Sequence, residues 1–245
     1  DLIEAGKRSD IALGCETSKG FNNVTLARRG SSGWKVEIKG KRRHSAGIFL
    51  NGVGAGAIFE SGRILNDFYE NLKGETYLTF NPGIILGGTE ISYDEPSNTG
   101  NAFGKTNVVA QSVIIDGDLR FISEEQKEQT REKMREIVSN NLPETSAEIT
   151  FFDSYPAMPP TQKNRNLLKK FSDVSVSMGH GPVEAWDPSK RGAADVSFVA
   201  QYVACIDGLG AMGNWAHTSK ETINLKTFEV LTQRTAVLIY RLINE

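Results

Sequence analysis

Apolar positions in the first part of the chain follow the spacing of β-strands. Residues 10–15 form a short apolar run, which predicts a buried strand that ends at Glu16. Asn23–Arg28 and Trp34–Lys39 alternate apolar and polar residues on either side of a glycine-rich turn at 29–33. This alternation predicts two half-buried strands joined by that turn.

Helical and strand patterns alternate between residues 34 and 148. Apolar residues at helical spacing predict a helix over Gly56–Leu72, and Ser123 and Gln126 form a capping box that opens a second helix. The strands expected between these helices are Tyr77–Phe80, Gly83–Leu86 and Ser112–Phe121. Residues 94–105 are predicted to be a polar loop. The order strand, helix, strand, strand, helix, strand is typical of a ferredoxin-like split βαβ unit.

The remainder of the chain returns to larger alternating elements. We expect a helix over Asn164–Met178, a strand over Tyr202–Ile206 and a closing helix over Leu225–Ile243. We therefore predict a discontinuous α/β domain from residues 1–32 and 149–245, into which an α+β ferredoxin-like domain, 33–148, is inserted.

Composition and charge exclude several classes of protein. The chain has 245 residues, of which 39% are apolar and 24% charged, as in globular proteins with an ample core. A net charge of −2 gives no general attraction to nucleic acid, and no apolar run is long enough to cross a membrane, so neither is an expected partner. Cys15 and Cys205 are too few for a disulfide scaffold and are expected to be buried thiols. A start at Asp1, without methionine, is expected of a fragment or processed product.

Two polar residues follow predicted strands, where α/β sheets place functional groups. Glu16 ends the first strand, and His217 lies in the glycine-rich loop after the strand at 202–206. Both are candidate metal ligands, and from the residues alone a solvent-facing carboxylate and a hydrogen-bonded structural histidine remain alternatives. The spacing Gly208-x-Gly210-x-x-Gly213 matches a dinucleotide fingerprint, but no βαβ unit follows it, so we expect no dinucleotide.

Several short motifs occur in a fixed order along nearly the whole chain. They are Ala12-Leu-Gly-Cys-Glu16, Arg29-Gly-x-x-Gly-Trp34, Val36-Glu-Ile-Lys-Gly-Lys-Arg-Arg-His44-Ser-Ala-Gly47, Gly87-Gly88, Asn107, Asp118-Leu-Arg120, Arg191-Gly-Ala-Ala-Asp195, Gly208-Leu-Gly210 and His217-Thr-Ser-Lys-Glu221. Together these motifs resemble the co-catalytic zinc exopeptidase family that includes carboxypeptidase G, the aminoacylases and succinyl-diaminopimelate desuccinylase.

The resemblance implies a specific domain arrangement and metal content. Residues 1–32 and 149–245 are expected to be part of an α/β catalytic domain, which in the intact enzyme holds two zinc ions per subunit. Residues 33–148 are expected to be a ferredoxin-like lid through which two chains form a homodimer. In this family Glu16 matches a carboxylate ligand of one zinc ion, and His217 matches the histidine ligand of the other.

The resemblance also implies substrate-binding residues. His44 matches a lid histidine that polarises the scissile carbonyl, often in the partner subunit's site. Asn107 and Arg120 match lid residues that bind the substrate carboxylate, and the loop at Arg191 and Gly192 matches a segment that offers backbone donors to the same carboxylate. The family usually carries a proline near positions 109–110, where this chain has Val-Ala.

The function implied is that of a zinc-dependent metallohydrolase that cleaves an amide or peptide bond next to a free carboxylate. The enzyme is expected to be a carboxypeptidase or an N-acyl amino acid hydrolase, because Glu16 resembles that branch more than the aminopeptidase branch. Residues 1–245 contain no counterpart of the family's remaining ligands and general-base glutamate. We therefore expect an incomplete zinc site and no activity from the isolated chain. The alternative is a non-catalytic dimerisation or ligand-binding module derived from that family.

Overall fold

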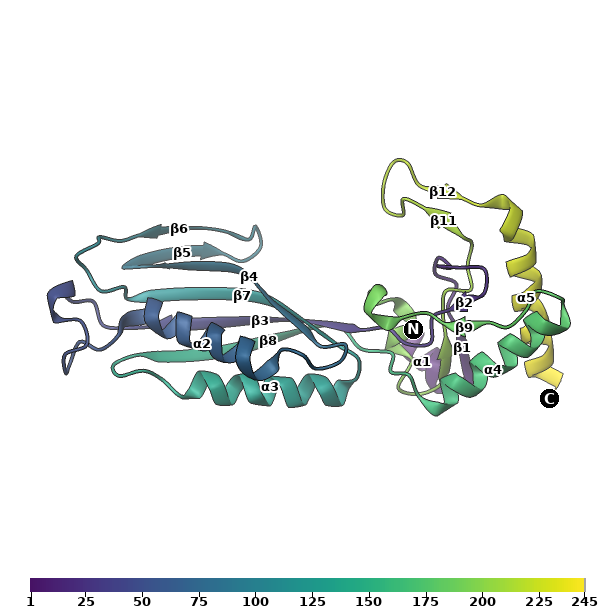
Figure 1. The fold of residues 1–245 in the computed structure, drawn as a ribbon, viewed down its shortest axis with the longest axis horizontal. Helices are drawn as coiled ribbons and strands as arrows, with labels where there is room; N and C mark the ends of the chain where they lie inside the picture. The colour runs from purple at the N-terminus through teal and green to yellow at the C-terminus, as the bar shows by residue number, and fades with distance from the viewer. Residues whose placement is uncertain (245) are drawn as a thin grey trace. The chain divides into compact units, whose positions relative to one another are not determined.

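The computed structural model describes residues 1–244, which form two compact units. The first unit consists of Asp1–Gly30 and Tyr155–Glu245, and the second consists of Ser31–Ser154. Figure 1 shows the helices and strands of each unit. Within residues 1–244, no helix combines the length and the apolar character that crossing a bilayer requires.

The second unit is built on a four-stranded sheet with strand order β4-β7-β3-β8. The strands are β3 (Gly30–Lys39), β4 (Thr79–Gly88), β7 (Ser112–Phe121) and β8 (Ser146–Tyr155). β4 and β7 are antiparallel. β4 continues through a bulge at Pro82, so it is a single strand where the sequence predicted two short ones. Gly40 donates its N–H to the carbonyl of Gln111, and the Trp34 indole donates to the carbonyl of Asp118, so β3 also runs opposite to β7.

Two helices cover one face of this sheet (Figure 1). The predicted helix over Gly56–Leu72 is confirmed as α2. The predicted N-cap is confirmed, because the Ser123 hydroxyl accepts the N–H of Gln126 at 3.1 Å at the start of α3 (Glu124–Ser139), but the Gln126 side chain accepts the N–H of Ile122 at 2.9 Å and not that of Ser123, so the capping box is only half formed. The core residues between sheet and helices include Trp34, Ile64, Phe68, Ile115, Leu119 and Met134, all fully buried.

A hairpin lies over the opposite face of the sheet, where the sequence predicted a polar loop. That prediction is wrong: β5 (Glu90–Asp94) pairs antiparallel with β6 (Thr99–Phe103). The Tyr93 hydroxyl donates to Asp116 at 3.0 Å, and Asp116 points away from the helix-covered face because it neighbours the buried Ile115. β6 is exposed throughout and has no alternation, whereas β5 alternates polar residues with the half-buried Ile91 and Tyr93, a strand signal that the prediction missed.

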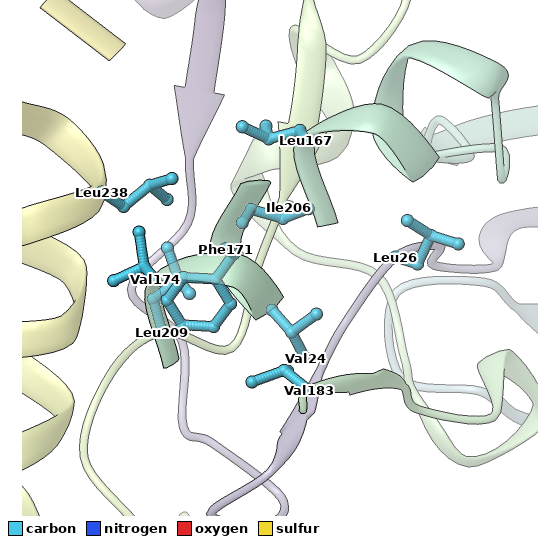
Figure 2. Packing of buried hydrophobic residues seen from close by; sticks show 9 residues of the cluster. All are labelled: Val24, Leu26, Leu167, Phe171, Val174, Val183, Ile206, Leu209 and Leu238. Carbon is cyan, nitrogen blue, oxygen red and sulfur yellow. The ribbon is translucent and has the colours of Figure 1, made fainter. Parts of the chain in front are cut away.

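The first unit has smaller sheets and the helices α1 (Leu2–Lys7), α4 (Gln162–Ser177) and α5 (Leu225–Asn244). β1 (Ile11–Leu13) pairs in parallel with β10 (Ala204–Ile206), and β2 (Asn23–Val24) pairs in parallel with β9 (Glu184–Ala185). Figure 2 shows the core in which Leu167, Phe171 and Val174 of α4 meet Ile206 and Leu238.

The two cysteines lie in different environments. Cys205 in β10 is fully buried, as predicted. Cys15 is exposed, so the prediction that it is buried is wrong. The reason is that β1 ends at Leu13, which leaves Cys15 in the connecting segment beyond the strand.

Candidate functional site

Glu16 lies just beyond the end of β1, in a segment that runs beside the chain leaving β10. The N–H of Gly210 donates to the carbonyl of Glu16 at 3.0 Å, and Ser18 and Met212 form an isolated parallel bridge. The backbone N–H of Glu16 donates to the carboxylate of Asp207 at 3.2 Å. The backbone of Glu16 is therefore fixed on both sides, while its own carboxylate is exposed.

His217 lies in the loop that joins β11 (Gly213–Asn214) to β12 (Thr222–Ile223). Its imidazole is exposed and its φ angle is +64°. Trp215, two residues earlier, also has a positive φ of +61°. Positive φ is uncommon for residues other than glycine, and such strain is concentrated at functional sites.

The segments that carry these two residues meet at one pocket of the first unit. The pocket has a volume of about 260 Å³, and Thr17, Ala216 and Glu221 contribute to its lining. Thr17 follows Glu16 and Ala216 precedes His217 in the sequence. Within residues 1–244, no group of three or more His, Cys, Asp or Glu side chains could hold a metal ion. Glu16 and His217 do not by themselves form a four-coordinate zinc site.

In the second unit, the structure brings His44 and Asn107 together. His44 forms an isolated antiparallel bridge with Val108, and the N–H of Ser45 donates to the carbonyl of Asn107 at 2.9 Å. The His44 ring is exposed, and its Nδ1 accepts the N–H of Ala46 at 3.2 Å. Because Nδ1 accepts a hydrogen bond, the proton of the neutral ring is on Nε2, which is left to donate outward.

Arg120 lies at the other end of the sheet from this pair. It is the penultimate residue of β7, whereas Asn107 precedes the start of that strand. Its Nε donates to the Asp118 carboxylate on the same face at 2.9 Å. The ten residues of β7 span roughly 30 Å, so Arg120 and the His44–Asn107 pair lie far apart at opposite ends of the sheet.

The loop that contains Arg191 and Gly192 belongs to the first unit. The Arg191 side chain is only 7% exposed, and its Nε and Nη2 atoms are buried without a hydrogen-bond partner. Burial lowers the pKa of the Arg191 guanidinium, and the positive charge of Arg28 lowers it further. Gly192 is exposed, and its carbonyl accepts a hydrogen bond from Arg28 at 2.8 Å.

Arg28 and Asp207 are polar residues near the site that the sequence did not single out. Arg28 belongs to a segment whose alternation predicted a half-buried strand, yet its side chain is 3% exposed. The sequence could have indicated Asp207, because it follows β10 directly, much as Glu16 follows β1. A carboxylate at the end of a short apolar strand is a candidate site residue.

Comparisons with solved structures show chains of the same fold. Aminopeptidase PepT from Bacillus cereus has a TM-score of 0.69 and 15% identity, and the match covers 94% of this chain and 57% of that one. A tripeptidase from Staphylococcus aureus has a TM-score of 0.68 and 18% identity over 97% and 58% of the two chains. Bacillus subtilis YxeP, described as a dinuclear metal-binding peptidase, has a TM-score of 0.65 and 16% identity over 97% and 59%. This chain thus spans less than three-fifths of the length of the structures it matches.

A search of curated proteins gave no match. Residues 26–146 match the family model described as the peptidase dimerisation domain. This range contains the four-stranded sheet up to the start of β8, both covering helices and the hairpin. It also contains His44, Asn107 and Arg120. Residues 26–146 thus match a peptidase dimerisation domain, and the predicted resemblance of this chain to the exopeptidase family that carries such a lid is confirmed.

Proposed function

We propose that this chain is part of a dimeric zinc-dependent hydrolase that cleaves an amide or peptide bond next to a free carboxylate. The first unit is then the part of the catalytic domain that carries the ligands Glu16 and His217, and the second unit is the lid. The placement of both segments along one pocket supports this assignment. The fold is shared with an aminopeptidase, so it does not distinguish an aminopeptidase from a carboxypeptidase or an N-acyl amino acid hydrolase. We favour the latter two because position 16 is a glutamate.

The topology of the second unit supports a ferredoxin-like lid. Apart from the β5–β6 hairpin between β4 and β7, the helices and sheet strands follow the order β3, α2, β4, β7, α3, β8 along the chain, and in the sheet the strands lie in the order β4-β7-β3-β8. Each helix thus connects two strands that have a third strand between them. This arrangement is the split βαβ pattern.

The observation that carries the proposal is the separation of His44 from Arg120 along β7. His44 offers an Nε2 donor suited to developing charge on a carbonyl oxygen. Arg120 has its Nε bonded to Asp118, and a guanidinium has further N–H donors that suit a carboxylate. Since roughly 30 Å separates the ends of β7, the two side chains act on one substrate only if they come from two chains. We infer a site in which each lid supplies Arg120 to one substrate, and His44 with Asn107 to the other.

An exposed apolar patch supports dimerisation near His44. We define the patch as Phe49, Ile58, Phe59 and Ile85, which are 53% to 67% exposed. The rings of Phe49 and Phe59 are in contact, with centroids 5.5 Å apart. Exposed contiguous apolar side chains mark interaction surfaces. A second copy of this chain is the proposed occupant, because residues 26–146 match a dimerisation domain and His44 requires a partner chain.

Subunit complementation tests this proposal in the native protein that contains this chain. We expect His44→Ala and Arg120→Ala to be inactive as separate dimers. Mixing and reassociating them gives half mixed dimers with one intact site each, so about a quarter of wild-type activity returns. A mixture that stays inactive, or single variants that retain full turnover, would contradict the shared site. A protein that dimerises but holds no zinc by elemental analysis would instead be the non-catalytic module.

A further inference from the structure

The first unit contains a buried ion pair that the proposed reaction does not use. Arg28 Nε donates to Asp207 Oδ2 at 2.6 Å, and the two side chains are 3% and 0% exposed. Removing two charges from water is costly, so further hydrogen bonds to both groups are needed to offset that cost, and they are present on Asp207 and on Arg28 Nη1 although Arg28 Nη2 has no partner. The partners of each group therefore indicate what the pair does.

Asp207 connects three segments of the chain. Its Oδ1 accepts the N–H groups of Glu16 and Gly208, and its own backbone exchanges two hydrogen bonds with Thr25 at 2.7 and 2.9 Å. The fit is tight, since a β-carbon at Gly14 would fall 2.3 Å from Oδ1. Asp207 thus fixes the Glu16 segment and the start of the loop that leads to His217.

Arg28 extends these connections to the loop at 191–194. Its Nη1 donates to the carbonyl of Gly192 at 2.8 Å. In a trans peptide the carbonyl and the following N–H point in opposite directions. The N–H of Ala193 is therefore directed away from the buried pair. In the part of the chain that the structure describes, the N–H groups of Gly192 and Ala193 have no hydrogen-bond partner.

We propose that Arg28 is a positioning residue that presents the Ala193 N–H to the substrate carboxylate, with Asp207 holding Arg28 in place. The inference rests on the proposed function, because it takes the loop at 191–194 as the carboxylate-binding segment. The Arg191 side chain is buried with its Nε and Nη2 unbonded, whereas Arg28 bonds directly to the carbonyl of the Gly192–Ala193 peptide and so fixes its orientation. Lysine at position 28 keeps the charge but lacks the fork that reaches Asp207 and Gly192 together.

The test compares two ligands on the native protein that contains this chain. N-benzoylglycine has the free carboxylate, and N-benzoylglycinamide replaces it with a neutral amide. We expect wild type to bind the carboxylate more tightly by calorimetry. Arg28→Lys should weaken binding of the carboxylate roughly tenfold or more and leave the amide unchanged. Arg234→Lys is the matched control, since Arg234 is equally buried but bonds to Ser175 and Phe21; it should leave both affinities unchanged.

Each outcome is decisive. If wild type prefers the carboxylate and Arg28→Lys keeps that preference, the positioning role is overturned while the proposed function stands. If wild type has no preference, the carboxylate site fails and the inference fails with it. Should Arg28→Lys not fold, ¹⁵N-alanine spectra of wild type replace it. The Ala193 amide should then shift with N-benzoylglycine and not with the amide analogue, and an unmoved signal overturns the inference.

Discussion

The indole ring of Trp34 lies directly against Gly117, so that a β-carbon at position 117 would fall 2.3 Å from two ring carbons. Trp34 is fully buried in the second unit, and its Nε1 donates to the carbonyl of Asp118 at 3.1 Å. We expect Gly117→Ala to displace the ring and to lower the free energy of unfolding by about 1–3 kcal/mol. Urea unfolding followed by tryptophan fluorescence measures this loss.

Gly62 provides the control for that substitution. It lies in α2, and a β-carbon there would meet no atom within 4 Å. Gly62→Ala should raise the free energy of unfolding by up to about 1 kcal/mol, because alanine is the better helix former. Equal shifts from the two variants would show that Trp34 does not set the cost at position 117.

The sequence predicted the elements whose apolar spacing is regular. α2 matches its predicted bounds, and α3 begins at its predicted cap, because burial against one sheet imposes a helical period on each. β6 could not be predicted in this way because all five of its residues are exposed, although β5 alternates polar residues with Ile91 and Tyr93. The two strands are held by mutual pairing and by the bond from Tyr93 to Asp116, which is a contact between residues distant in sequence.

The site was predictable only in part, for a related reason. Glu16 and His217 stand next to strand-like runs, so their positions are visible in the sequence. The role of Arg28 depends on contacts with Gly192 and Asp207, which are 164 and 179 residues away. Alternation along residues 23–28 describes a half-buried strand and carries no information about such distant partners.

Acid should destabilise the second unit through Asp153. A hydrogen bond from Arg131 at 2.6 Å, with the charges of Arg131 and Lys127, holds the pKa of Asp153 below its ordinary value. A carboxyl group whose pKa is lowered in the folded state stabilises the fold above the unfolded pKa of about 3.9. This stabilisation is lost as the pH falls through the folded-state pKa. Asp153→Asn should cost under about 1 kcal/mol at pH 7, since the carboxylate is largely exposed. The difference between wild type and variant in urea should vanish at low pH, and a difference independent of pH would contradict this.

The two thiols should differ in reactivity. Burial, and then the negative charge of Asp207, raise the pKa of Cys205 to about 12, whereas Cys15 is exposed. Because the thiolate is the reactive form, a disulfide reagent at pH 8 should modify Cys15 alone in the folded chain. Cys205 should react only after denaturation. Cys15→Ser should abolish the fast reaction, and a fast reaction that survives this substitution would show that Cys205 is accessible.

A charge in the apolar patch should weaken the dimer. Phe59 is 56% exposed and touches Phe49, so Phe59→Asp places a carboxylate where we propose that a second copy packs. We expect the dimer dissociation constant to rise at least about tenfold, as measured by sedimentation. Phe152 is 49% exposed on β8 and serves as the control. Phe152→Asp should leave the dimer intact, and dissociation by this variant instead would move the interface to β8.

The length of β7 also limits how this domain can diverge. β7 lies between β4 and β3 in the sheet, so a single inserted residue would turn every later side chain to the other face unless a bulge absorbs it, as the bulge at Pro82 does in β4. A viable change in length therefore needs either such a bulge or matched two-residue additions in neighbouring strands. Point substitutions meet no such barrier, and the chain retains its fold at 15% identity to PepT. The distance along β7 between the end that follows Asn107 and the end that contains Arg120 is thus more strongly constrained than the identity of the residues in the strand. Residues at either end can be substituted without changing this distance.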